Sequence, residues 1–178
     1  MTKIFLNPGH APYGIPDPGA VNKELGAKEA DIVRVVGYML ASYLEGSGYE
    51  TKLVQDDSLE AVTRAANNWE ADYFVSVHCN SAYTDQALGT ETYCYEYGGE
   101  GERLAECINN RIVRKMNMVD RDVKEANFYV LRHTTMPAVL VEMGFISNTE
   151  DCIKLLDKPQ DFAEAIYKGI LDYLEGEE

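Results

Sequence analysis

The sequence has few positive charges. Its 16 lysine and arginine residues are outnumbered by 30 aspartate and glutamate residues, and the formal net charge is −14. This balance disfavours nucleic acid and anionic membrane surfaces as partners, because both repel an acidic protein. No stretch approaches the roughly 20 apolar residues that cross a bilayer, so we expect no membrane insertion. The chain enters an apolar segment at once, so we expect no export signal. The protein would then be made in the cytoplasm, unless a leader has been removed.

Cysteine is also scarce, and its spacing excludes one class of site. The four residues are Cys79, Cys94, Cys107 and Cys152, and no two of them form a C-x-x-C pair. A cysteine-ligated zinc site is therefore disfavoured. We expect reduced thiols packed in the core, which suits a reducing compartment. No internal repeat, low-complexity tract or linker divides the 178 residues, so we expect one domain over 1–178.

Strand-like and helix-like segments alternate along the chain. Apolar runs predict strands at residues 3–7, 49–54, 73–78, 90–96, 127–131 and 136–141. Helical spacing of apolar residues predicts helices at residues 28–44, 58–70, 101–116, 151–156 and 161–174. Residues 8–26 contain four prolines and four glycines, which predicts a long ordered loop. The alternation predicts an α/β domain with a twisted, mostly parallel central sheet and helices on both faces.

Three of these strands run directly into residues that can carry chemistry. The first leads to His10, the third ends at His78, and the last ends at Glu142. Right-handed crossovers place the carboxyl ends of parallel strands on one side, where open α/β sheets hold their ligands. Two histidines and a glutamate on one rim predict a metal site or an acid–base site. Each histidine taken singly could instead be a core or loop residue.

Glu29 is the most informative single residue. It precedes Ile32, Val33 and Val36 by three, four and seven positions, so it shares their inward face. A first-turn acid favoured by the helix dipole is one interpretation. The other is a metal ligand, since His, Glu and His form a ligand set of catalytic zinc that leaves a fourth position open. Glu24 is a rival for this position, but it lacks the helical phase.

Glu142 is the natural fourth member of the site. A carboxylate beside the zinc can take a proton from the attacking water and pass it to the leaving nitrogen. The alternative is a strand-end glutamate paired with an arginine such as Arg132. His133 is the only histidine besides His10 and His78, and Thr134-Thr135 follow it in an expected loop.

Several segments together resemble a known family. They are Asn7-Pro-Gly-His10, Asp17-Pro-Gly-Ala20, Gly26-Ala-Lys-Glu29, Ser76-Val-His-Cys-Asn80, Arg64-Ala-Ala-Asn67, Tyr129-Val-Leu-Arg132 and Val139-Leu-Val-Glu-Met-Gly-Phe-Ile-Ser-Asn148. In this order they resemble the zinc-dependent N-acetylmuramoyl-L-alanine amidases of the Amidase_3 type. The resemblance implies one zinc per chain on His10, Glu29 and His78, with Glu142 as the catalytic glutamate.

The resemblance also implies a substrate and a setting. Such enzymes cut the amide bond between N-acetylmuramic acid and L-alanine in peptidoglycan, so the expected place of action is the bacterial cell wall. A monomer resembling the catalytic part of an endolysin or an autolysin is expected. Two departures are visible: the loop from Ala11 to Pro16 is extended, and Arg121-Asp122 replaces an expected Arg-Gly. A zinc peptidase acting on stem peptides and a non-catalytic wall-binding module are the alternative functions.

Overall fold

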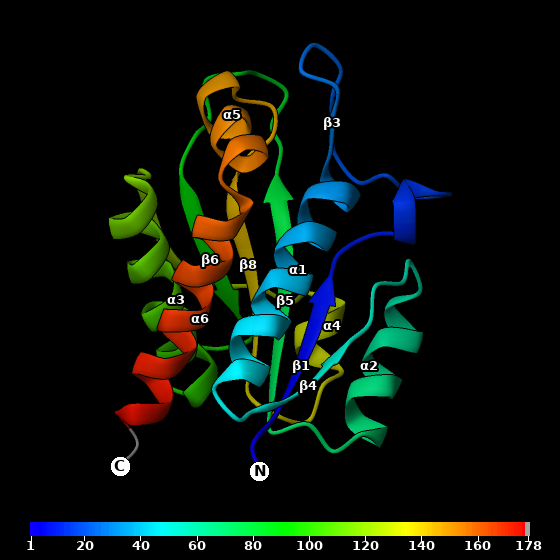
Figure 1. Ribbon diagram of the computed structural model, residues 1–178, viewed down its shortest axis with the longest axis vertical. Coiled ribbons are helices and arrows are strands. Elements are labelled where there is room, and N and C mark those ends of the chain that lie inside the picture. Colours follow the sequence, from blue (N-terminus) through cyan, green and yellow to red (C-terminus); the bar gives the residue numbers. More distant parts are fainter. Residues whose placement is uncertain (177–178) are drawn as a thin grey trace.

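A computed structural model describes residues 1–176. They form three layers, a central sheet with helices on each of its two faces (Figure 1). The strands are β1 (Lys3–Pro8), β2 (Val21–Asn22), β3 (Ala27–Lys28), β4 (Glu50–Leu53), β5 (Tyr73–Asn80), β6 (Thr90–Cys94), β7 (Asp120–Glu125) and β8 (Ala138–Phe145). The helices are the 3-10 turn η1 (Pro12–Gly14), α1 (Glu29–Gly46), α2 (Leu59–Asn68), α3 (Glu100–Met116), α4 (Tyr129–Arg132), α5 (Thr149–Asp157) and α6 (Pro159–Glu175).

The main sheet has six strands in the order β4-β1-β5-β8-β6-β7. All neighbouring pairs are parallel except β6 and β8, which run antiparallel. The predicted α/β class with a mostly parallel sheet is therefore confirmed. A separate two-stranded ribbon pairs β2, which lies in the predicted loop, with β3, which follows the loop directly.

Each central strand buries both of its faces, because successive side chains point to opposite sides of a sheet. Ile4, Leu6, Val75, Val139 and Val141 belong to the larger apolar cluster, together with residues of α1, α3 and α6. The alternate residues of the same strands, such as Phe5, Phe74 and Leu140, pack with α2 and α4 in a second cluster. Helices therefore cover both faces of the sheet, as the sequence predicted.

One expectation about residues 117–131 is wrong, and one strand in this region was not predicted. The segment predicted as a strand at 127–131 contains the short helix α4, which buries Val130 and Leu131 over four residues. A run this short shows too little periodicity to separate helix from strand. The sequence analysis also missed β7, whose six residues include five charged ones. Charged residues are typical of an exposed edge strand, and they hide its apolar signal.

The loop over residues 8–26 returns toward the sheet and carries η1 and β2. All four cysteines are free thiols, three of them buried and Cys107 partly buried. Among the described residues, none of the helices has the length and apolar character needed to cross a membrane.

Candidate active site

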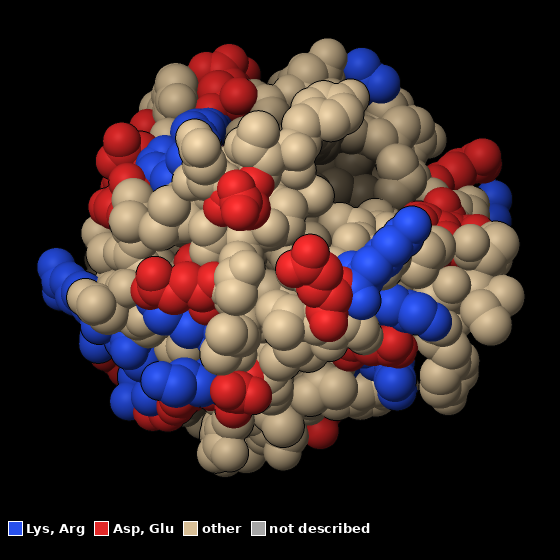
Figure 2. Space-filling model, turned by 90° about the horizontal axis from the view of Figure 1, so that it is seen from above, with Lys and Arg blue, Asp and Glu red and all other residues tan. Residues whose placement is uncertain are grey.

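The candidate site lies where β1 and β5 end. In Figure 1 both strands point toward the top, and Figure 2 shows that the molecule is hollowed on this face. A cleft of about 380 Å³ opens there. Its lining comes from four regions of the chain: Asn7, Gly9, His10 and Asp17; Asp56, Asp57 and Leu59; His78; and Phe128, Tyr129, Val130, Leu140 and Glu142.

Close backbone approach brings His10 and His78 together. Their ring centroids are 5.2 Å apart. A Cβ atom on Gly9 would lie 2.1 Å from Cε1 of His78, and one on Gly19 would lie 2.5 Å from Cδ2 of His10. Glycine is therefore required at both positions. His10 itself has a φ of 66°, a left-handed conformation that costs a non-glycine residue about 1–3 kcal/mol and occurs most often at functional sites.

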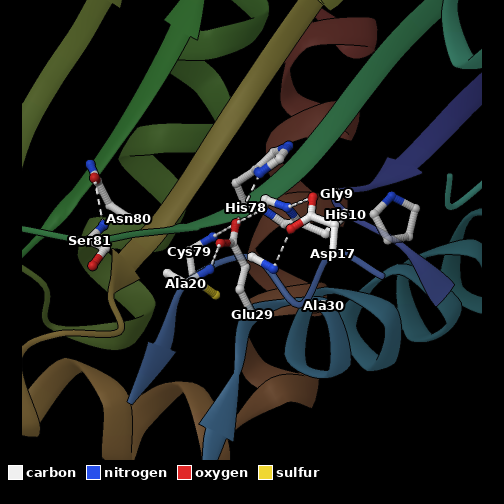
Figure 3. A network of polar contacts seen from close by, with 12 residues as sticks. Gly9, His10, Asp17, Ala20, Glu29, Ala30, His78, Cys79, Asn80 and Ser81 are labelled. Atoms are coloured by element: carbon white, nitrogen blue, oxygen red, sulfur yellow. Dashed lines mark hydrogen bonds and ion pairs between the residues drawn. The ribbon is translucent and has the colours of Figure 1, made fainter. Parts of the chain in front are cut away.

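Glu29 joins the two histidines from the first turn of α1 (Figure 3). Its Oε1 atom lies 2.9 Å from Nε2 of His10 and 3.0 Å from Nδ1 of His78. The backbone N–H groups of Ala20 and Cys79 also donate to this carboxylate, at 2.9 and 3.0 Å. Burial alone would raise the pKa of Glu29, but hydrogen bonds from the two histidines hold it well below its ordinary value. Glu29 therefore remains an anion although it is only 4% exposed.

Asp17 orients His10 from the other side of the ring. Its Oδ2 atom lies 2.7 Å from Nδ1 of His10, and the backbone N–H of Gly19 donates to its Oδ1 at 2.9 Å. A proton on Nδ1 leaves Nε2 facing Glu29, which is the arrangement that carboxylates impose on metal-binding histidines. Burial alone would lower the pKa of His10, but the bonds with Glu29 and Asp17 raise it to about 9. A metal ion would displace the proton that Nε2 carries.

The three side chains fit a zinc ion. Among residues 1–176, His10, Glu29 and His78 form the only group of three possible ligands, with all ligand atoms within 4.8 Å of one another. In a tetrahedral zinc site with bonds of about 2.0–2.1 Å, neighbouring ligand atoms lie about 3.3 Å apart. The observed separations of 2.9 and 3.0 Å need only a small expansion to reach this value. Two imidazoles and a carboxylate are also a donor set that catalytic zinc uses.

Glu142 lies beside this group on the neighbouring strand, where it pairs in register with His78. Its Oε2 atom is buried without a hydrogen-bond partner among residues 1–176. Burial raises the pKa of Glu142 to about 7, although the electrostatic effect of the neighbouring His78 opposes the rise. A bound cation would lower this pKa again, since positive charge favours the carboxylate. Such a group can exchange a proton near neutral pH.

The other residues that the sequence offered for the site lie outside it. Glu24 is exposed in the turn between β2 and β3, outside the ligand group. No arginine pairs with Glu142 in the described part of the chain, so the pairing with Arg132 is wrong. His133 is exposed, stacks on Tyr129 at 3.9 Å and does not line the cleft.

Two polar residues near the site were not assigned a role from the sequence. Asp17 lies in a segment rich in proline and glycine, where an aspartate is common in turns. Glu91 is 3% exposed and faces Glu142 across β6 and β8. The sequence did contain a clue to Glu91, because it is a charged residue within an expected strand of alternating apolar and polar residues. A carboxylate that faces inward in such a strand needs hydrogen-bond partners.

Comparison with known proteins gives the site its context. Residues 4–172 match the family described as N-acetylmuramoyl-L-alanine amidase (Amidase_3). The chain belongs to this family. Its activity is that of an N-acetylmuramoyl-L-alanine amidase acting on peptidoglycan, and the resemblance found in the sequence is confirmed.

Individual amidases are similar over almost all of the chain. The sporulation-specific N-acetylmuramoyl-L-alanine amidase of Bacillus subtilis is 36% identical over 180 residues, which cover 98% of this chain and 68% of that protein. The endolysin of Bacillus phage SPP1 is 38% identical over 187 residues, covering 96% of this chain and 65% of its own length. Among solved structures, amidase AmiC2 of Nostoc punctiforme matches with a TM-score of 0.89 and 33% identity, covering 98% of this chain and 97% of that one. The chain thus spans about two thirds of the length of these two curated relatives.

Proposed function

We propose that this amidase is zinc-dependent and cleaves the amide bond between N-acetylmuramic acid and L-alanine. The observation that carries the proposal is the convergence of His10, Glu29 and His78 on one point of the cleft, with Glu142 beside them. A zinc ion on these three ligands would polarise the amide carbonyl and make a water molecule more acidic. We also propose that residues 1–178 act as one catalytic domain and as a monomer.

The protein's own groups divide the remaining work. Glu142 accepts a proton from the attacking water and delivers it to the alanine nitrogen as that nitrogen leaves. Its buried Oε2 atom, which has no other partner within residues 1–176, is free for this transfer. Asp17 holds His10 in the tautomer that keeps Nε2 toward the ligand group. Phe128 and Leu140 form apolar walls that exclude water from part of the cleft.

Analysis of products tests the bond that is cut. Purified peptidoglycan is digested with and without a chelator, and the fragments are measured by mass spectrometry. An amidase releases peptides that begin with a free L-alanine amine, and chelation should abolish their release. Fragments cut inside the stem peptide would instead identify the alternative zinc peptidase. Undiminished release in chelator would contradict zinc dependence.

Asp17→Asn should weaken zinc binding about 10- to 100-fold, because the amide no longer fixes the tautomer of His10 as a carboxylate does. Competition with a metal chelator measures this affinity directly, without reference to turnover. Asp56→Asn is a matched control, since Asp56 also lines the cleft but its carboxylate accepts from the backbone of Ser58. Equal zinc affinity in the Asp17 variant and the wild type would exclude a role for Asp17 in metal binding.

Net charge should affect the approach to whole cells. Gram-positive walls carry anionic polymers, and they should repel a domain with a net charge of −14 at low ionic strength. We therefore expect lysis of whole cells to rise with moderate salt, and to rise again when a basic or wall-binding module is fused to the chain. Turbidity measured over a series of salt concentrations checks this. A steady fall in lysis from the lowest salt upward would show that local attraction outweighs the net charge.

A further inference from the structure

A row of polar side chains crosses the sheet from the candidate active site toward β7. His78 pairs in register with Glu142, and Glu142 pairs with Glu91. Tyr93, two positions after Glu91 on β6, pairs in register with Lys124 on β7. Register partners point to the same face of a sheet, so this row lies on the face that forms the cleft.

Glu91 is the centre of this row, and it is fully hydrogen-bonded. Its Oε1 atom accepts from Asn80 at 2.6 Å and from the hydroxyl of Tyr93 at 2.7 Å. Its Oε2 atom accepts from Nε of Arg121 at 2.8 Å and from Nζ of Lys124. Burial alone would raise the pKa of Glu91, but its hydrogen bonds, that from Lys124 foremost, bring it below the ordinary value. Glu91 is therefore an anion that holds two cations in place.

Glu91 accepts from two cations. Arg121 and Lys124 carry two charges against the single charge of Glu91, and their side chains are 35% and 36% exposed. The guanidinium of Arg121 is also fixed 4.9 Å from the centre of the Phe145 ring. Within residues 1–176, its Nη groups have no hydrogen-bond partner. The pair thus offers free donors to a ligand, in a chain whose net charge is −14.

The pair is connected to the cleft through Glu91, which holds both cations and pairs in register with Glu142, a residue of the cleft lining. Phe128 lines the cleft, and its ring meets that of Tyr93 edge-on at 5.0 Å. The opposite side of the cleft carries carboxylates, namely Asp17, Asp56 and Asp57. The charge therefore changes from the carboxylates of the cleft to the cations beyond Glu142, and this difference favours an anionic group of a ligand on the side toward β7.

We propose that Arg121 and Lys124 form a subsite that binds a carboxylate on the peptide part of the substrate. The inference rests on the proposed function, in which Glu142 protonates the leaving nitrogen and the departing peptide lies on the Glu142 side. Adjacent strands are about 4.8 Å apart, so the cations bound to Glu91 lie about one or two strand spacings from Glu142. A peptide residue spans at most about 3.6 Å. If the departing alanine is counted as the first residue, the carboxylate of the second residue can therefore reach Arg121 and Lys124.

Two substrates that differ in one group test the subsite on the unaltered protein. They are muramyl peptides whose second residue is isoglutamate, with a free carboxylate, or isoglutamine, with a carboxamide. Charge-assisted hydrogen bonds distinguish these groups, and we expect kcat/KM to be about tenfold higher for the carboxylate. Equal values for the two substrates would overturn the proposal.

Lys124→Met supplies the matching change in the protein. Arg121 still neutralises Glu91 in this variant, so the buried carboxylate keeps a cation and the chain should fold. We expect the ratio of kcat/KM for the carboxylate substrate to kcat/KM for the carboxamide substrate to fall toward one. The kcat/KM for the carboxamide substrate itself should change little. Lys168→Met on α6 is the control variant and should behave as the wild type. A Lys124 variant that lowers kcat/KM equally for both substrates would indicate a structural role only.

A binding measurement separates this inference from the proposed function. The dipeptide L-alanyl-D-isoglutamate and its carboxamide are titrated into the metal-loaded wild type and the Lys124→Met variant. We expect the wild type to bind the carboxylate dipeptide about tenfold more tightly than the carboxamide dipeptide, and the Lys124→Met variant to bind the two equally. If neither muramyl peptide is cleaved, the proposed function fails while this titration still decides the subsite. Binding that is equal for the two dipeptides, or absent for both, would refute it.

Discussion

Glu142→Gln should fold, keep its zinc and lose at least about a hundredfold in turnover, because loss of general acid–base catalysis typically costs 10²- to 10⁴-fold in rate. Glutamine keeps the size of the side chain but removes the basic oxygen. No neighbour can replace that oxygen: His10 and His78 would be occupied as ligands of the proposed zinc, and His133 lies outside the cleft lining. The rigid strand β8 fixes the backbone at this position, so relaxation cannot bring another group into place.

Initial rates on purified peptidoglycan measure this loss, with metal content and thermal unfolding measured on the same samples. His133→Gln is the matched control and should retain nearly normal turnover. Nearly normal turnover in the Glu142 variant would remove Glu142 from the mechanism and make His133 the next candidate.

The stability of the metal-free protein gives an independent check on Glu142. Since its pKa is raised to about 7, ionisation of the buried carboxyl should reduce stability as pH rises from its ordinary pKa through 7. The loss is at most roughly 3–4 kcal/mol for a shift of this size. Glu142→Gln removes this titration. The stability of the variant relative to that of the wild type should therefore increase between pH 5 and pH 9. Urea unfolding of both metal-free proteins at these pH values measures the difference.

Removal of any one metal ligand should abolish tight zinc binding. We expect the wild type to bind one zinc per chain and His10→Ala, Glu29→Ala and His78→Ala each to lose it, because two protein ligands hold zinc much more weakly than three. Zinc at a thousand times its dissociation constant stabilises a folded protein by about 4 kcal/mol. For a domain of this size, that corresponds to a rise in Tm of about 10 °C.

Metal analysis and thermal unfolding with and without added zinc check this expectation. Zinc should raise the Tm of the wild type and leave that of the three variants nearly unchanged. Glu24→Ala is the control, because Glu24 is the rival carboxylate and is exposed in a nearby turn. Full zinc in the Glu29 variant, together with loss in the Glu24 variant, would move the ligand to Glu24.

The accuracy of the sequence predictions differed between central and peripheral elements for a physical reason. Central strands such as β5 and β8 bury both faces, so their apolar runs are long and predict the strands that carry His78 and Glu142. The strands do not end there as expected, since β5 continues to Asn80 and β8 to Phe145. The phase of Glu29 with Ile32, Val33 and Val36 predicted its inward orientation, and it is buried. The edge strand β7 has little apolar surface to bury and left no such signal. The short helix α4 was misassigned because four residues complete only one turn.

The sequence by itself determined the kinds of group available and the element that carries each one. It placed two histidines and a carboxylate on or directly after apolar strands, and a second carboxylate on the inner face of the first helix. Only the tertiary structure decided which atoms meet, because Glu29 reaches His78 across 49 residues of chain and Asp17 reaches His10 through a folded loop. The pairing of Glu91 with Glu142 depends on the antiparallel register of β6 and β8. Register follows from packing between whole strands, and no local pattern specifies it.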